Sequence, residues 1–278
     1  MNGVKGQLAW LVNALCLGLA LSYGLSASAQ QPPLAVIVAS GSTTRPQSRT
    51  DANSQAAHRE LITKAHAGII DVYFIGDSIT RRWGALDYPE LLANWNRNFH
   101  GWNAADFGWG GDRTENMLWR LEHGEFEGVH PKVIAIQAGT NNLGDMPGDQ
   151  AQIDLITAGI KALINSCRAK APAATIVVTG VFLRSDKPQY NIVINGINHE
   201  LAALADGKQI RFVNINHVLA DANGQLAKDK SVDGLHLSAS AYQLWADALK
   251  PIFTELLGPP AAVDHAPPPT GDPAARKG

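Results

Sequence analysis

The chain has 278 residues, of which 45% are apolar and 17% are charged, and its formal net charge at pH 7 is −2. This composition is that of a globular protein, and it excludes disorder along the whole chain. The small net charge gives no reason to expect a nucleic-acid partner or an anionic lipid surface.

Residues 1–29 have the pattern of a secretory signal peptide. Lys5 provides a positive charge, the apolar stretch LAWLVNALCLGLAL follows, and Ala-Ser-Ala at 27–29 provides the small residues that precede a cleavage site. The pattern predicts cleavage after Ala29 and export to the periplasm or the medium. The alternative is an uncleaved membrane anchor, which the polar residues Asn13 and Ser22 disfavour because they interrupt the apolar run.

Two further segments flank the expected domain. Residues 30–52 are rich in Pro, Ser and Thr and have no lasting periodicity, which is typical of a flexible leader. Residues 258–278 are rich in Pro, Ala and Gly and are predicted to be a disordered tail. The folded domain is therefore expected over residues 53–257.

Cys167 is the only thiol that remains after signal cleavage, so an intramolecular disulfide is excluded and a buried structural role is expected.

Within this domain, short apolar runs alternate with helical patterns. The runs predict strands at 71–76, 103–108, 132–139, 174–181 and 210–215, and the helical patterns lie at about 53–66, 87–98, 114–122, 149–169, 190–205 and 238–256. Most runs are apolar on both faces, as in parallel strands that helices cover on both sides. The alternation predicts one three-layer α/β/α sandwich with a five-stranded parallel sheet of the flavodoxin-like type, and sites in such sheets form at the carboxyl ends of the strands.

The first strand end carries Ser78, in the sequence FIGDSIT. As the opening residue of a helix, Ser78 has a backbone N–H without an intrahelical partner, and the helix dipole favours negative charge beside it. Its hydroxyl is either an ordinary helix cap or a nucleophile that attacks a carbonyl.

The second strand is followed by FGWGGDRT, with Gly108, Gly110 and Gly111. The spacing matches neither the dinucleotide-binding pattern nor the Walker pattern. The glycines form either a tight turn or a loop whose bare N–H groups approach a ligand.

The third strand ends in GTNN, and Asn141 offers an amide donor that stays neutral at every working pH. It suits an oxyanion hole, and the alternative is an Asx-turn.

Asp233 and His236 lie three residues apart in DGLH, just before the last helix. In one turn, the carboxylate can accept a hydrogen bond from one ring nitrogen and leave the other free to act as a base. The alternatives are a surface pair or half of a metal site, but no Cys/His cluster or further spaced ligand supports a metal.

Together, the blocks GDSIT, GWGGDRT, GTNN and DGLH resemble those of the SGNH (GDSL-type) hydrolases, in the same order. The longer runs FIGDSIT, FGWGGDRTENMLWRLEHGE and PKVIAIQAGTNN are most similar to the branch that contains the catalytic subunits of platelet-activating factor acetylhydrolase Ib and many exported bacterial relatives. The resemblance covers roughly residues 72–257. It implies the SGNH hydrolase fold and a serine esterase that needs neither metal nor cofactor.

The resemblance also assigns roles to residues. It implies that Ser78 is the nucleophile, His236 the base and Asp233 the residue that orients this base. The backbone N–H groups of Ser78 and Gly111 and the side-chain amide of Asn141 would form the oxyanion hole, with Gly110 as the alternative to Gly111.

The substrate is not fixed by the resemblance. Short loops and the lack of a long apolar lid favour a small-molecule or carbohydrate ester with a short acyl group, such as acetyl. The alternatives are a lysophospholipase or thioesterase and a non-catalytic binding protein on the same fold. Trp109 either packs in the core or offers a sugar a stacking surface, and Arg184 and Lys187 are expected to lie in a solvated loop rather than to contact a leaving group.

Overall fold

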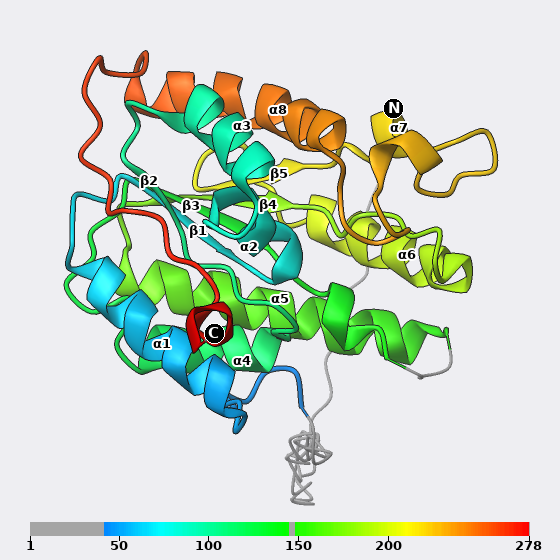
Figure 1. The fold of residues 1–278 in the computed structure, drawn as a ribbon. Helices are drawn as coiled ribbons and strands as arrows, with labels where there is room; N and C mark the ends of the chain where they lie inside the picture. Colours follow the sequence, from blue (N-terminus) through cyan, green and yellow to red (C-terminus); the bar gives the residue numbers. More distant parts are fainter. Residues whose placement is uncertain (1–41, 145–147, 278) are drawn as a thin grey trace, which may run out of the picture. The chain divides into compact units, whose positions relative to one another are not determined.

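A five-stranded, all-parallel sheet forms the centre of the structure, a computed structural model that describes residues 42–144 and 148–277 (Figure 1). Its spatial order is β2-β1-β3-β4-β5. The strands are β1 Val72–Gly76, β2 Ala104–Asp106, β3 Val133–Gln137, β4 Thr175–Thr179 and β5 Ile210–Val213. Each strand lies within a predicted run, so the predicted fold class is confirmed. The predicted signal peptide and residues 30–41 of the predicted leader lie outside the described residues.

Helices cover both faces of the sheet (Figure 1). Helices α1, α4, α5 and α6 lie on one face, and α2, α3 and α8 lie on the other. The α-helices are α1 Ala52–Ala65, α2 Ser78–Gly84, α3 Pro89–Phe99, α4 Thr114–Glu122, α5 Gln150–Lys170, α6 Asn191–Ala202, the single turn α7 Asn216–Leu219 and α8 Ala239–Leu257. Short 3₁₀ turns are η1 Thr140–Asn142, η2 Pro188–Tyr190, η3 Lys228–Lys230 and η4 Pro273–Lys277. No helix in the described ranges is long and apolar enough to cross a bilayer.

Aromatic packing fixes helix α2 against the sheet. Trp83 of α2 is fully buried, and its ring lies 4.7 Å from that of Trp245 in α8 and 4.9 Å from that of Phe99 in α3. Phe74 of β1 packs edge-on against Trp95 of α3 at 4.8 Å. Because large buried aromatic rings contribute much of the stabilisation of a core, α2 and its first residue are held rigidly at the end of β1.

Cys167 is fully buried, as predicted, and burial raises its pKa to about 12.

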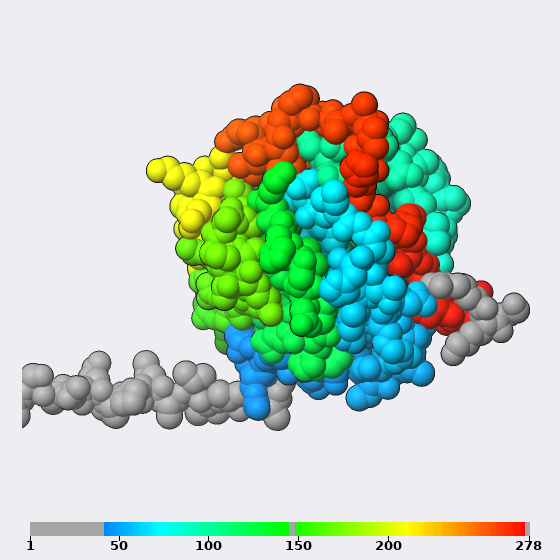
Figure 2. Space-filling view, turned by 90° about the vertical axis from the view of Figure 1, so that its left-hand side faces the viewer, coloured from blue at the N-terminus to red at the C-terminus, as the bar shows by residue number. Residues whose placement is uncertain are grey.

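The carboxy-terminal segment 258–277 is ordered, in contrast to the prediction of a disordered tail. It runs over the surface near β2 and is the red segment of Figures 1 and 2. Its backbone pairs with the domain: Ala261 N donates to Gly101 O at 2.9 Å, Ile69 N to His265 O at 2.8 Å and Leu86 N to Thr270 O at 3.0 Å. The composition predicted disorder because the segment has few large apolar residues, yet the domain itself provides the hydrogen-bonding partners. We call residues 258–277 the C-terminal strap.

The described part of the predicted leader also packs on the domain. Thr43 is buried, and its hydroxyl donates a hydrogen bond to Leu155 O at 2.5 Å. Gln47 N donates to Glu115 O, and Gln47 O accepts from the Asn116 side chain, both at 2.9 Å. Residues 42–51 are therefore a fixed N-terminal segment that leads directly into α1 and not a flexible leader.

Candidate active site

Ser78, His236 and Asp233 form a continuous hydrogen-bonded chain. Ser78 is the first residue of α2, directly beyond β1, and its Oγ lies 2.9 Å from His236 Nε2. The other ring nitrogen, Nδ1, lies 2.6 Å from Asp233 Oδ2. Asp233 Oδ1 accepts from the backbone N–H of His236 at 2.7 Å and of Leu235 at 3.0 Å, so the tight turn fixes the carboxylate. The fold brings together residues that lie 158 positions apart.

The electrostatics keep the histidine neutral and the aspartate ionised. Burial lowers the pKa of His236 below its usual value, the hydrogen bond that its ring donates to Asp233 opposes this, and the charge of Arg82 lowers the pKa further. Burial acts to raise the pKa of Asp233, but hydrogen bonds from the backbone and ring of His236 outweigh it and hold the pKa below its usual value. An ionised carboxylate accepts a hydrogen bond from Nδ1–H, so Nε2 carries a lone pair that can receive the Ser78 proton.

The three donors predicted for the oxyanion hole each have a hydrogen that is available. Within residues 42–144 and 148–277, the backbone N–H groups of Ser78 and Gly111 donate no hydrogen bond. A Cβ placed on Gly110 would lie 3.8 Å from Ser78 Cβ, so the glycine loop runs beside the serine. Asn141, in the turn after β3, donates one amide hydrogen to Asp112 O at 2.9 Å and has a second hydrogen available.

This chain is similar to known proteins. A family model described as the GDSL-like lipase/acylhydrolase family matches residues 74–244. The chain belongs to this family. It is therefore an ester hydrolase by family, and the resemblance read from its motifs is confirmed.

The relatives of this GDSL-like hydrolase include acetylhydrolases. It is 31% identical to platelet-activating factor acetylhydrolase IB subunit alpha1 of Homo sapiens over 209 residues. This alignment covers 74% of this chain and 85% of the relative. It is 29% identical over 202 residues to the alpha2 subunit of Gallus gallus, covering 72% of this chain and 83% of the relative.

Solved structures share the fold. A GDSL-like lipase from Bacteroides thetaiotaomicron superposes with a TM-score of 0.57 at 19% identity, covering 72% of this chain and 98% of the other. The lipase Lip_vut3 from a goat rumen metagenome superposes with a TM-score of 0.51 at 17% identity, covering 66% and 96% of the two chains.

Asp77 and Gly108 of the hydrolase pack the serine helix tightly. Asp77 Oδ1 accepts from Ile79 N at 2.8 Å and caps α2, while Oδ2 has no hydrogen-bond partner among the described residues. Burial raises the pKa of Asp77 to about 7. A Cβ on Gly108 would lie only 2.6 Å from Arg81 N, so glycine is needed where the loop after β2 meets α2. Reasoning from the sequence missed both roles.

The loop after β4 supports the turn that carries the histidine. Ser185 N donates to Gly234 O at 2.9 Å. Arg184 is buried and forms two hydrogen bonds with the Asp186 carboxylate, at 2.8 and 2.5 Å, whereas Lys187 is exposed. The expectation of a solvated loop is therefore wrong for Arg184, because its guanidinium group pairs inside the loop.

Trp109 is only 7% exposed, and the Arg81 guanidinium lies 4.8 Å from its ring centre. Its backbone N–H donates to Gly76 O at 3.0 Å. The side chain is packed, which favours the core interpretation over a sugar-stacking surface.

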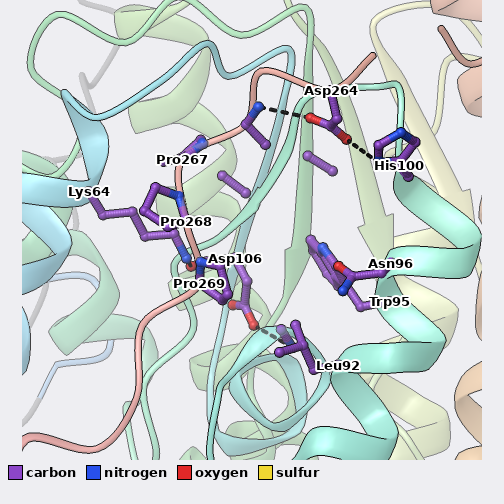
Figure 3. A pocket seen from close by; sticks show the side chains of 14 residues that line it. Lys64, Leu92, Trp95, Asn96, His100, Asp106, Asp264, Pro267, Pro268 and Pro269 are labelled. Atoms are coloured by element: carbon purple, nitrogen blue, oxygen red, sulfur yellow. Dashed lines mark hydrogen bonds and ion pairs between the residues drawn. The ribbon is translucent and has the colours of Figure 1, made fainter. Parts of the chain in front are cut away.

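A cavity of about 380 Å³ lies away from the four motifs, between the C-terminal strap, β2 and α3 (Figure 3). Lys64, Trp95, Asp106 and Pro267–Pro269 are among its lining residues. Lys64 Nζ donates to Asp106 O at 2.7 Å.

The described residues contain no cluster of three or more His, Cys, Asp or Glu side chains that could hold a metal ion.

Proposed function

We propose that Ser78, His236 and Asp233 are the catalytic triad of a metal-independent serine esterase. The observation that carries this proposal is the hydrogen-bonded chain from Ser78 Oγ through His236 to Asp233, at 2.9 and 2.6 Å. The membership in an acylhydrolase family supports it. A hydroxyl, a neutral imidazole and an ionised carboxylate in this order are the groups that nucleophilic catalysis at an ester carbonyl requires.

The proposed reaction has two halves. Ser78 Oγ attacks the ester carbonyl as His236 Nε2 takes its proton, and the N–H groups of Ser78 and Gly111 and the amide of Asn141 stabilise the oxyanion. His236 returns the proton to the leaving alcohol, and an acyl-serine remains. Water, deprotonated by His236, then attacks the acyl-serine and releases the carboxylic acid, which restores Ser78.

We further propose short acyl esters, acetyl esters above all, of small molecules or carbohydrates as substrates. The names of the relatives in the acetylhydrolase Ib group support acetyl transfer to water. The absence of a long apolar insertion from the sequence also favours small acyl groups over long chains. We also propose that the protein is exported. Sequencing the N-terminus of the mature protein would test this proposal, and Gln30 is the first residue expected.

The test compares wild type with Ser78→Ala on p-nitrophenyl esters of increasing chain length, acetylated sugars, lysophospholipids and thioesters. Removal of the nucleophile should lower kcat on p-nitrophenyl acetate by at least about 10³-fold, while the melting temperature stays within a few degrees of wild type. Equal turnover by both proteins would exclude Ser78 as the nucleophile. A wild-type optimum at ten carbons or more would reject the acetyl preference and leave the esterase assignment intact.

A further inference from the structure

The N-terminal segment reaches the glycine loop of the proposed oxyanion hole through Arg49. Arg49 Nη1 donates a hydrogen bond to Gly110 O at 3.0 Å and lies 3.5 Å from Asp112 Oδ1. Its Nε is 2.9 Å from Asp51 Oδ2. A Cβ placed on Gly111 would lie 2.9 Å from Arg49 Nη1, so the guanidinium packs directly against this residue.

The contact with Gly110 O has a direct consequence for Gly111 N–H. The carbonyl of residue 110 and the N–H of residue 111 belong to one peptide group, which is planar and trans. Its C=O and N–H therefore point in opposite directions. A side chain that holds the carbonyl on one side also fixes the direction of the N–H on the other side, which is free of any other partner in the described structure.

This peptide needs an external restraint. It joins two glycines, and Gly111 has a φ of 79°, in the left-handed region. Because glycine occupies both signs of φ at similar cost, rotation of the 110–111 peptide meets little steric resistance. A rotated peptide would present its carbonyl oxygen, and not its N–H, to a developing negative charge.

Arg49 itself is held in place by helix α1. Asp51 is the N-cap of α1, with Oδ1 accepting from Ser54 N at 2.8 Å and Oδ2 paired with Arg49. The next residue of the glycine loop, Asp112, also pairs with Arg120, whose Nε lies 2.5 Å from Oδ2. Arg120 has no hydrogen bond to the 110–111 peptide in the described structure, so it does not duplicate the contact of Arg49.

We propose that Arg49 is a positioning residue that orients the Gly111 N–H toward the oxyanion, and that the N-terminal segment is thereby part of the catalytic machinery. The inference rests on the proposed esterase function. Arg49 contacts no reacting atom. It acts on the transition state through one peptide group, so its removal should lower kcat more than it raises KM.

The experiment compares wild type, Arg49→Ala, Arg49→Lys and a matched control, Arg45→Ala. Arg45 lies in the same segment and is exposed. Active sites are first counted with a fluorophosphonate, so that rates refer to competent enzyme. For each protein, kcat and KM are measured on p-nitrophenyl acetate, and Ki is measured for an aryl trifluoromethyl ketone, which forms an oxyanion on the serine. Guanidinium chloride is then added at low millimolar concentration.

We expect Arg49→Ala to lose about 10- to 100-fold in kcat per active site, with Ki for the ketone rising by a similar factor. Arg49→Lys should lie in between, free guanidinium should partly restore Arg49→Ala, and Arg45→Ala should match wild type. An Arg49→Ala enzyme with wild-type kcat, or one that loses active sites while the remainder keeps wild-type Ki, would overturn the inference. Failure of the esterase proposal is distinct, since wild type would then show no Ser78-dependent hydrolysis at all.

Discussion

Arg82 is a side chain whose charge contributes to the pH range of the site. It lies one helical turn after Ser78 on α2, and its Nη1 is 3.8 Å from Asp233 Oδ2. Burial is the main cause that lowers the pKa of His236, and the positive charge of Arg82 lowers it further. A lower pKa keeps the imidazole neutral, and able to accept the Ser78 proton, in more acidic solution.

Arg82→Gln should therefore move the acid limb of the kcat/KM profile to higher pH. Loss of the cation raises the pKa of His236, so a larger fraction of the enzyme carries a protonated, inactive histidine at pH 6, while activity near pH 8 changes little. Arg82→Lys keeps the charge and serves as the control. The measurement is kcat/KM on p-nitrophenyl acetate between pH 5 and pH 9, and an acid limb that stays in place or moves to lower pH would contradict this account.

The sequence predicted the candidate residues of the proposed site but not those that support them. Ser78, Asn141, Asp233 and His236 could be found because their residue types and positions at strand ends follow from the local pattern. Arg49 could not be found in this way, because its proposed role depends on a contact with Gly110, 61 positions away, and nothing in the surrounding leader-like composition marks it.

At the scale of elements, the C-terminal strap is the segment whose behaviour differs most from its composition. Asp264 accepts hydrogen bonds from Gly101 N at 2.7 Å and Ala266 N at 2.8 Å, and Asp272 accepts from Asn53 at 2.9 Å. Prolines 267–269 cover the cavity beside β2 (Figure 3). Proline restricts the unfolded chain, so ordering this segment costs less entropy than its irregular path implies.

A variant that ends at Gly258 should be less stable than the full chain by about 1–3 kcal/mol, because several backbone donors of the domain lose their partners. Urea unfolding and the melting temperature would measure this difference. Asp264→Ala, which removes one contact to the domain (Gly101 N) and one within the strap (Ala266 N), should lose about 1 kcal/mol. Unchanged unfolding free energies in both variants would show that the strap contributes nothing to the fold, while hydrolysis of p-nitrophenyl acetate serves as the control and should persist.

The regular elements were predictable for a physical reason. The strands are buried runs and the helices begin at residues such as Asp51, Asp77, Asp149 and Ser238, whose side chains accept from the first turn. The single turn α7 and the 3₁₀ turns were not predicted, because three or four residues are too few to show a period.

At the scale of the whole described domain, all five strands direct their carboxyl ends toward one edge, and the segments that follow them carry the candidate site residues. Beyond β1 lies Ser78, beyond β2 the glycine loop, beyond β3 Asn141, and beyond β5 the turn with His236. The loop beyond β4 holds that turn through Gly234 O. Parallel topology brings these ends to one edge, so chain order alone could predict that Ser78 and His236 meet there. The N-terminal segment and the C-terminal strap do not belong to the alternation of strands and helices. No periodicity in their sequences could predict where they pack on the domain.

Covalent labelling tests the central claim, that the hydroxyl of Ser78 is activated by His236, most directly. The enzyme is treated with a fluorophosphonate and digested, and the modified residue is found by tandem mass spectrometry. The account predicts one phosphonylated residue, Ser78, with much slower labelling in His236→Ala and none in Ser78→Ala. Labelling of another residue, or equal labelling of Ser78→Ala and wild type, would contradict it.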